Sequence, residues 1–202
     1  MGKRRQNIMI LIGLLVLAFI GGFAYWLWVK SIALPILGEI EEYKSTTVSD
    51  ESFTIEKGKI RLISVAESGC PSVCEQKLKL LKELQQDLID EKAFVSRVYM
   101  ITIMEDENDQ ELFKKHVKTY DVDEKGWKFV SLQADDQKNL LERIEQSKEN
   151  DGWLTLVDAN GRIRQHYNIE NKDEKKQLIK DVKQLIRIQQ QTIEERRQNR
   201  NE

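Results

Sequence analysis

The sequence predicts an α/β domain, with helices flanking a central sheet of mixed strand direction, that follows one N-terminal transmembrane helix. Short stretches rich in β-branched residues alternate with segments whose apolar residues recur every three or four positions. Such alternation favours right-handed crossovers and a partly parallel sheet. An uncharged, strongly apolar stretch near the start of the chain predicts the membrane span.

The predicted membrane span covers residues 8–29. At about 1.5 Å per residue, a helix of this length crosses a hydrocarbon core about 30 Å thick, and it exceeds the apolar region of a signal peptide. It ends in Tyr25, Trp26 and Trp28, which suit the membrane interface. Three basic residues precede the span and only Lys30 follows closely, so we expect a cytoplasmic N-terminus and a domain in the periplasm or extracytoplasmic space.

We expect four parts along the chain: residues 1–30 as cytoplasmic stub and anchor, 31–51 as linker, 52–188 as the folded domain and 189–202 as a polar tail. The linker contains Pro35 and many polar residues. The tail has almost no apolar residues and is expected to be a frayed helix or disordered. The net charge is −2, with basic and acidic residues interspersed, which argues against a nucleic-acid partner.

The expected elements of the domain follow from periodicity and turn residues. Strands are predicted at residues 53–55, 59–65, 94–104, 127–132, 153–157 and 162–167, and helices at 71–90, after Asn108 or Asp109, from 135 or 136 to 144, and over 178–186. The segment 158–161, Asp-Ala-Asn-Gly, reads as a hairpin turn. This order, closed by a hairpin and a helix, is the layout of a thioredoxin-like domain, which is an analogy of fold and not of function.

The segment Gly69-Cys70-Pro71-Ser72-Val73-Cys74 holds both cysteines of the chain and joins a predicted strand to a predicted helix. Cysteines four residues apart lie on one side of a helix turn. We expect Cys70 at the start of the helix and Pro71 at its first position, where the missing N–H costs nothing. The backbone N–H groups and the helix dipole there favour a thiolate and lower the cysteine pKa.

Three kinds of chemistry fit this cysteine pair. The thiols can oxidise to a disulfide and exchange it with other proteins, or bind a soft metal, for which Cu(I) is the natural candidate. A purely structural disulfide is the third possibility, but so short a loop restrains the unfolded chain little.

The segment Cys70-Pro71-Ser72-Val73-Cys74 resembles the Cys-Pro-x-Val-Cys motif of the SCO/SenC proteins, which are membrane-anchored, thioredoxin-like assembly factors of cytochrome c oxidase. The resemblance extends over about residues 59–188, with a strand followed by an acidic loop at 98–109 and a late strand with an Asp-x-x-Gly turn at 153–161. The family also has an N-terminal anchor, as expected here at residues 8–29.

The resemblance implies a function as well as a fold. Cys70 and Cys74 would be the redox-active and copper-binding thiols, and copper the metal. The partner would be cytochrome c oxidase subunit II or another extracytoplasmic thiol protein. The chain would support assembly of the oxidase copper centre by copper transfer, by reduction of the target's cysteines, or both.

The sequence departs from the family at several positions. The third copper ligand of the family is a His about ten residues before the Gly of the late turn, here Gly161, and residues 149–152 contain none. Glu67-Ser68-Gly69 and Glu75 flank the motif where the family usually has Thr before it and Pro after it. Thiol–disulfide exchange needs only the two sulfurs, so these departures bear mainly on copper.

Two histidines and an acidic loop are further candidates for ligands or modulators of the thiol pair. His116 is expected to have a surface or capping role. His166, on the returning strand, is the better of the two candidates to replace the missing family His as a copper ligand. The acidic loop 105–109 should lie at the carboxyl end of a strand, on the same rim as the motif, where it either tunes the thiols or is simply solvated.

Two other functions stay open at this point. One is a general thiol–disulfide oxidoreductase or redox sensor without copper. The other is a non-catalytic docking module whose thiols are unused, which the charged helices and the polar tail would suit. In the reductase mechanism we expect Cys70, nearer the helix end, to attack, and Cys74 to resolve the mixed disulfide.

Overall fold

A computed structural model of the chain describes residues 13, 16, 18–22, 34–49, 51–55, 57–66, 72–89, 98–106, 109–123, 126–146 and 153–199. The chain divides into two units, Met1–Pro35 and Ile36–Glu202. Most of the predicted membrane span lies outside the described residues, although residues 18–22 are helical. Over the described ranges, no helix is both long and apolar enough to cross a membrane.

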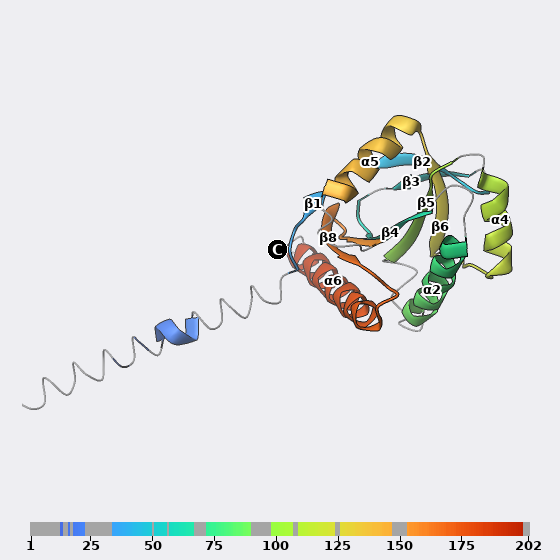
Figure 1. Cartoon of the computed structure of the whole chain (residues 1–202). Helices are drawn as coiled ribbons and strands as arrows, with labels where there is room; N and C mark the ends of the chain where they lie inside the picture. Colours follow the sequence, from blue (N-terminus) through green and yellow to red (C-terminus); the bar gives the residue numbers. More distant parts are fainter. Residues whose placement is uncertain are drawn as a thin grey trace, which may run out of the picture. The chain divides into compact units, whose positions relative to one another are not determined.

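The second unit is built on one eight-stranded sheet with the order β1-β8-β7-β4-β5-β6-β2-β3 (Figure 1). The strands are β1 (Gly38–Glu39), β2 (Tyr43–Thr47), β3 (Ser52–Ile55), β4 (Ile60–Ala66), β5 (Val98–Met104), β6 (Trp127–Leu132), β7 (Leu154–Val157) and β8 (Arg162–Tyr167). The helices of this unit are α2 (Ser72–Ile89), α4 (Gln110–Thr119), α5 (Ala134–Gln146) and α6 (Lys172–Gln198).

The centre of the sheet is parallel and its margins are antiparallel. β4 pairs in parallel with β5, from Ile60 opposite Val98 to Ala66 opposite Met104, and β5 pairs in parallel with β6. The remaining neighbours, including the β7–β8 hairpin, are antiparallel. The predicted mixed sheet is therefore confirmed, and the carboxyl ends of β4 and β5 meet at one edge.

Helices cover both faces of the sheet. Side chains along each strand point alternately to the two faces, so each face carries apolar residues that need a covering layer. On one face, Leu140 and Ile144 of α5 pack in a cluster with strand residues such as Ile63 and Ile101. Figure 1 shows α2 and α6 on the other side of the sheet from α5. The ring of Phe113 on α4 lies 5.7 Å from that of Phe129 on β6. The domain is thus a three-layer α/β structure.

Most expected elements are confirmed within two residues of their predicted ends. The strand over 127–132 and the returning strand at 162–167 match, and the motif helix is described over Ser72–Ile89. The strand predicted at 94–104 is β5 from Val98 onward, and residues 94–97 lie outside the described part. The hairpin turn is also confirmed: the Asp158 carboxylate accepts hydrogen bonds from the backbone N–H groups of Asn160 and Arg162 at 2.8 and 3.0 Å.

The predicted linker at 31–51 is wrong over much of its length, because β1 and β2 lie within it and pair with β8 and β6. The inward residues of β2 are mostly small and polar, so the strand lacks an apolar pattern. Ser45 and Thr47 are buried, and the Ser45 hydroxyl donates to the carbonyl of Phe53 at 2.8 Å. Polar side chains that have hydrogen-bond partners can be buried in a sheet, and the sequence then shows no alternation of apolar residues.

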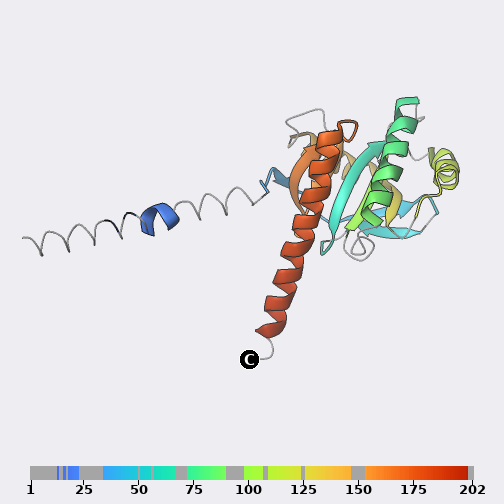
Figure 2. The same cartoon turned by 90° about the horizontal axis from the view of Figure 1, so that it is seen from below.

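The predicted boundary at residue 188 also differs, because α6 continues to Gln198. Asn171 caps its start, and its side chain accepts a hydrogen bond from the N–H of Asp173 at 3.0 Å. Beyond the boundary, the side-chain amide of Gln189 donates to the carbonyl of Gly58 at 2.7 Å. The first part of the predicted tail is therefore helical and contacts the domain. Figure 2 shows the end of α6 running past the sheet.

Candidate redox site

In the sequence, the motif begins three residues after Ala66, the last residue of the central strand β4. The N–H of Glu105, just after β5, donates to the carbonyl of Ala66 at 3.2 Å, so the two strands end together. Residues 67–71, including Cys70 and Pro71, lie outside the described part, and α2 is described from Ser72. The expected position of Cys70 at the start of the helix therefore stays a prediction.

Cys74 lies in the first turn of α2 and is buried, with 5% of its surface exposed. It is disulfide-bonded, and the chain contains one other cysteine, Cys70. Leu78, one turn later, is also buried, so this side of the helix packs toward the sheet. A buried sulfur is poorly placed to meet a partner protein first.

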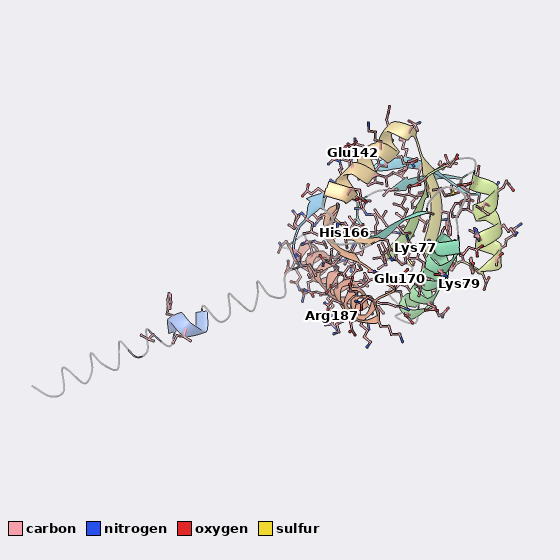
Figure 3. All side chains as sticks on the ribbon, viewed as in Figure 1. Lys77, Lys79, Glu142, His166, Glu170 and Arg187 are labelled. Atoms are coloured by element: carbon pink, nitrogen blue, oxygen red, sulfur yellow. The ribbon has the colours of Figure 1, made fainter. Side chains whose placement is uncertain are left out.

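A basic and an aromatic side chain lie beyond Cys74. The ammonium of Lys77 lies 5.6 Å from the ring centroid of Trp153, just before β7. The indole N–H of Trp153 donates to the side-chain oxygen of Asn168 at 3.3 Å, and its backbone N–H to the carbonyl of Tyr167 at 3.2 Å. Figure 3 labels Lys77 on α2. A cation near thiols stabilises the thiolate. Lys77 and Trp153 lie far apart in the sequence, so no local pattern predicts their contact.

A buried polar group spans the three central strands. The hydroxyl oxygens of Ser64 and Thr102 lie 2.8 Å apart, and the indole N–H of Trp127 donates to the Thr102 hydroxyl at 2.9 Å. All three side chains are at most 3% exposed. A satisfied buried network fixes the relative position of the strands. It therefore helps to set the strand end from which the motif starts.

His116 does not have the surface or capping role predicted for it. It is 7% exposed, with its ring 5.8 Å from that of Phe113 and stacked at 5.9 Å on that of Tyr120. Burial lowers its pKa, and the negative charge of Glu75, the residue after Cys74, acts in the opposite direction. Its Nε2 atom has no hydrogen-bond partner in the described part of the chain. The sequence signal for this burial was the spacing of three residues between His116 and Phe113, which places both on one side of the helix.

His166, the other candidate ligand, lies on β8 with its Nδ1 atom 3.0 Å from the hydroxyl of Thr155 (Figure 3). It is 5% exposed and stands opposite Thr155 in the hairpin. Across the described ranges, no group of three or more His, Cys, Asp or Glu side chains is placed to hold a metal ion. The donors that the motif itself offers are two sulfurs, a soft set that suits Cu(I) better than Cu(II).

The acidic loop after β5 lies on the rim predicted for it. Glu105 is exposed next to the end of β4, and its carbonyl accepts a hydrogen bond from the side chain of Gln137 at 3.1 Å. Asp109 stands at the capping position of α4, but its side chain makes no capping hydrogen bond. Residues 107–108 lie outside the described part. The loop therefore places negative charge on the motif side of the sheet.

No protein-family model matches the sequence, and a search of the curated proteins found no match. Solved structures do match. One is BsSco, a member of the Sco family of cytochrome c oxidase assembly proteins, with 20% identity, a TM-score of 0.60, and coverage of 76% of this chain and 96% of that chain. The match therefore spans nearly the whole of the other structure.

Two further structures show the range of proteins that share this architecture. Copper-bound ScoI of Bradyrhizobium japonicum has 19% identity and a TM-score of 0.51, covering 73% of this chain and 97% of that chain. The thioredoxin domain of the thiol-disulfide oxidoreductase BVU-2223 from Bacteroides vulgatus has 22% identity and a TM-score of 0.55, covering 74% and 99%. Sco proteins, the group indicated by the motif, thus stand among the structural neighbours. At these identities the likeness establishes that the chain has a thioredoxin-like fold.

Proposed function

We propose that this chain is a membrane-anchored, extracytoplasmic SCO-like protein that supports assembly of the cytochrome c oxidase copper centre through Cys70 and Cys74. The observation that carries the proposal is the disulfide-bonded Cys74 in the first turn of the helix that follows the central strand. The Sco proteins among the structural neighbours and the Cys-Pro-Ser-Val-Cys sequence support the same assignment.

In the thiol-exchange step, the Cys70 thiolate attacks one sulfur of a client disulfide. The client S–S bond breaks, a Cys70–client disulfide forms, and the leaving client sulfur takes up a proton. The Cys74 thiolate then attacks the Cys70 sulfur and releases the second client thiol. The client gains two electrons and two protons, and the chain keeps a Cys70–Cys74 disulfide. Burial of Cys74 supports its assignment as the resolving thiol.

In the copper step, the reduced pair carries Cu(I) as cargo. Two thiolates supply the soft donors that this ion prefers. Cys70 and Cys74 are the two protein ligands that the motif supplies to this ion. Transfer then exchanges the two cysteine ligands for those of the client. Oxidation of the pair removes both thiolates, so the same disulfide switches copper binding off.

The location rests on the N-terminal sequence. The apolar stretch 8–29, preceded by Lys3, Arg4 and Arg5, supports a single-pass anchor with the domain outside the cytoplasm. A disulfide-bonded Cys74 fits that oxidising compartment.

A thiol–disulfide oxidoreductase without copper is the second candidate. It is favoured by the disulfide, by the missing family His, and by the likeness to the oxidoreductase from Bacteroides vulgatus. This candidate and the copper chaperone use the same cysteines, so cysteine variants alone do not separate them. Copper retention by the reduced chain does.

The cellular test compares oxidase activity in membranes from cells that carry the wild-type chain or the Cys70→Ser/Cys74→Ser double variant. We expect lower oxidase activity in the variant, with partial recovery when copper is added to the medium. Equal activity in both strains, at equal amounts of the chain, would contradict a role in oxidase assembly.

A further inference from the structure

A hollow of about 320 Å³ lies between α6 and the turn of the β7–β8 hairpin. Its apolar wall is formed by Ile60 at the start of β4 and by Leu185, Ile188 and Ile193 of α6. Arg164 of β8 also lines it, and its guanidinium lies 2.6 Å from the carboxylate of Asp158. The charged groups of the hollow are thus paired with each other, and of its apolar wall Ile188 and Ile193 are exposed while Ile60 and Leu185 are buried.

The described part of the domain has few exposed large hydrophobic side chains, and two of the three line this hollow. The three are Ile36, Ile188 and Ile193, which are 54%, 46% and 37% exposed. Ile36 precedes β1, and the next residue, Leu37, donates its N–H to the carbonyl of Ile163 on β8 at 2.9 Å. The chain therefore enters the domain alongside the strand that lines the hollow.

The segment between the apolar stretch and the domain, called the tether here, limits the distance between an anchored domain and the membrane. Only residues 30–35 separate the apolar stretch from Ile36, and six extended residues reach about 20 Å. A domain of this size has a radius of gyration of about 15 Å. A tether this short keeps the entry point of an anchored domain, just before β1, within about 20 Å of the bilayer.

We propose that the surface formed by Ile188, Ile193 and the hollow beside them docks on the bilayer in which the chain's own N-terminal stretch is anchored, a proposal that rests on the anchoring proposed above. Exposed isoleucines on the end of a helix enter the interface between headgroups and acyl chains. Arg187, exposed on α6 and labelled in Figure 3, lies next to Ile188, where it meets the headgroups.

Docking in this way orients the redox motif. Ile60, at the hollow, begins β4, and Ala66, just before the motif, ends it. At about 3.3 Å per residue the two ends of the strand are about 20 Å apart. The cysteine pair then lies on the end of the sheet away from the docked surface, where a soluble or membrane-bound client domain reaches it.

The test uses the full chain in phospholipid vesicles with the photoreactive residue p-benzoylphenylalanine at one position. Ile193 and Ile188 are the test positions, and Lys79, exposed on α2 and labelled in Figure 3, is the control position. After irradiation, mass spectrometry identifies lipid adducts on the domain. We expect adducts at 193 and 188 and none at 79.

Alkaline extraction of the same vesicles separates failure of docking from failure of the anchor. Lipid adducts absent at both 193 and 188, in a chain that alkali does not release, would overturn docking and leave the anchor intact. Adducts between two protein chains at 193 in place of lipid adducts would also overturn it, because the surface would then bind a second copy. Release by alkali would overturn the anchor and docking together.

Discussion

The Lys77 ammonium lies 5.6 Å from the centroid of the Trp153 ring, which joins the second turn of α2 to the start of β7. Lys77 is one helical turn beyond Cys74, so this contact holds a positive charge on the side of the helix that carries the buried sulfur. Loss of that positive charge should make a thiolate of the reduced Cys70–Cys74 pair less stable.

We therefore expect Lys77→Met to raise the pKa of the more reactive thiol. A partly exposed charge contributes on the order of 0.2–1 kcal/mol, which corresponds to a few tenths of a pKa unit. The measurement is the rate of alkylation of the reduced chain by iodoacetamide as a function of pH. Lys79→Met is the matched control on the same helix (Figure 3) and should leave the profile unchanged. Equal shifts in both variants would show that Lys77 has no particular role.

The two cysteines should behave differently when one is replaced. With Cys74→Ser, the mixed disulfide between Cys70 and a client cannot be resolved, so we expect it to accumulate. With Cys70→Ser, little adduct should form because Cys74 is 5% exposed. The adducts are counted on non-reducing gels after reaction with a disulfide-bonded model protein. Trapping by Cys70→Ser alone would reverse the assignment of attacking and resolving thiols.

His116 should make the stability of the domain depend on pH. Burial lowers the pKa of His116 below its ordinary value of 6.5, so the unfolded chain binds this proton more readily than the folded chain. The stabilisation is fully present above about pH 6.5 and is lost as the pH falls below it. The slope is at most about 1.4 kcal/mol per pH unit.

The His116→Gln variant should lose this part of the dependence, as measured by urea unfolding at a series of pH values. The comparison uses the slope of unfolding free energy against pH, so a uniform change in stability does not affect it. An unchanged slope in the variant would mean that His116 does not titrate differently on folding.

Arg61 is expected to destabilise the domain. It is 1% exposed on β4, its Nη2 donates to the carbonyl of Asp158 at 3.3 Å, and its Nε and Nη1 atoms have no hydrogen-bond partner in the described part of the chain. Burial lowers its pKa to about 10, which still leaves it charged at neutral pH. Arg61→Met keeps much of the volume and removes the charge, so we expect the unfolding free energy to rise by about 1–3 kcal/mol.

The control for that prediction is Arg61→Ala, which removes the charge but leaves a cavity and should be less stable than the Met variant. Urea unfolding of the three proteins at neutral pH gives the comparison. A Met variant less stable than the wild type would show that the guanidinium has partners in solution that offset its burial.

The order of the central elements was predictable because their side chains are strongly patterned. The run from Ile60 to Val65 and the Asp-Ala-Asn-Gly turn at 158–161 each carry a local signal that the sheet does not override. β2 had no such signal, since its buried positions are filled partly by Ser45 and Thr47. Its place in the sheet depends on hydrogen bonds to distant strands, which local sequence does not reveal.

Only those parts of the site whose residues are neighbours in the sequence were predictable. The cysteine spacing and the strand before it could be read directly, and the acidic loop on the same rim followed from the parallel order of β4 and β5. The contact of Lys77 with Trp153 and the burial of His116 depend on the packing of elements far apart in sequence. The helical continuation to Gln198 was one of the two expectations for the tail. The sequence did not decide between them, because these residues are polar although most are good helix formers.

The most direct test of the copper assignment is competition for Cu(I) between the reduced domain, as a fragment that starts after Lys30, and a chromogenic chelator. Cys70→Ser and Cys74→Ser fragments serve as matched controls under the same reducing conditions. If the chain carries copper through its thiol pair, the wild-type fragment retains one Cu(I) per chain and each variant loses it. If the wild type gives up Cu(I) to a weak chelator as readily as the variants, the chain is a thiol–disulfide exchange protein and the copper assignment is wrong.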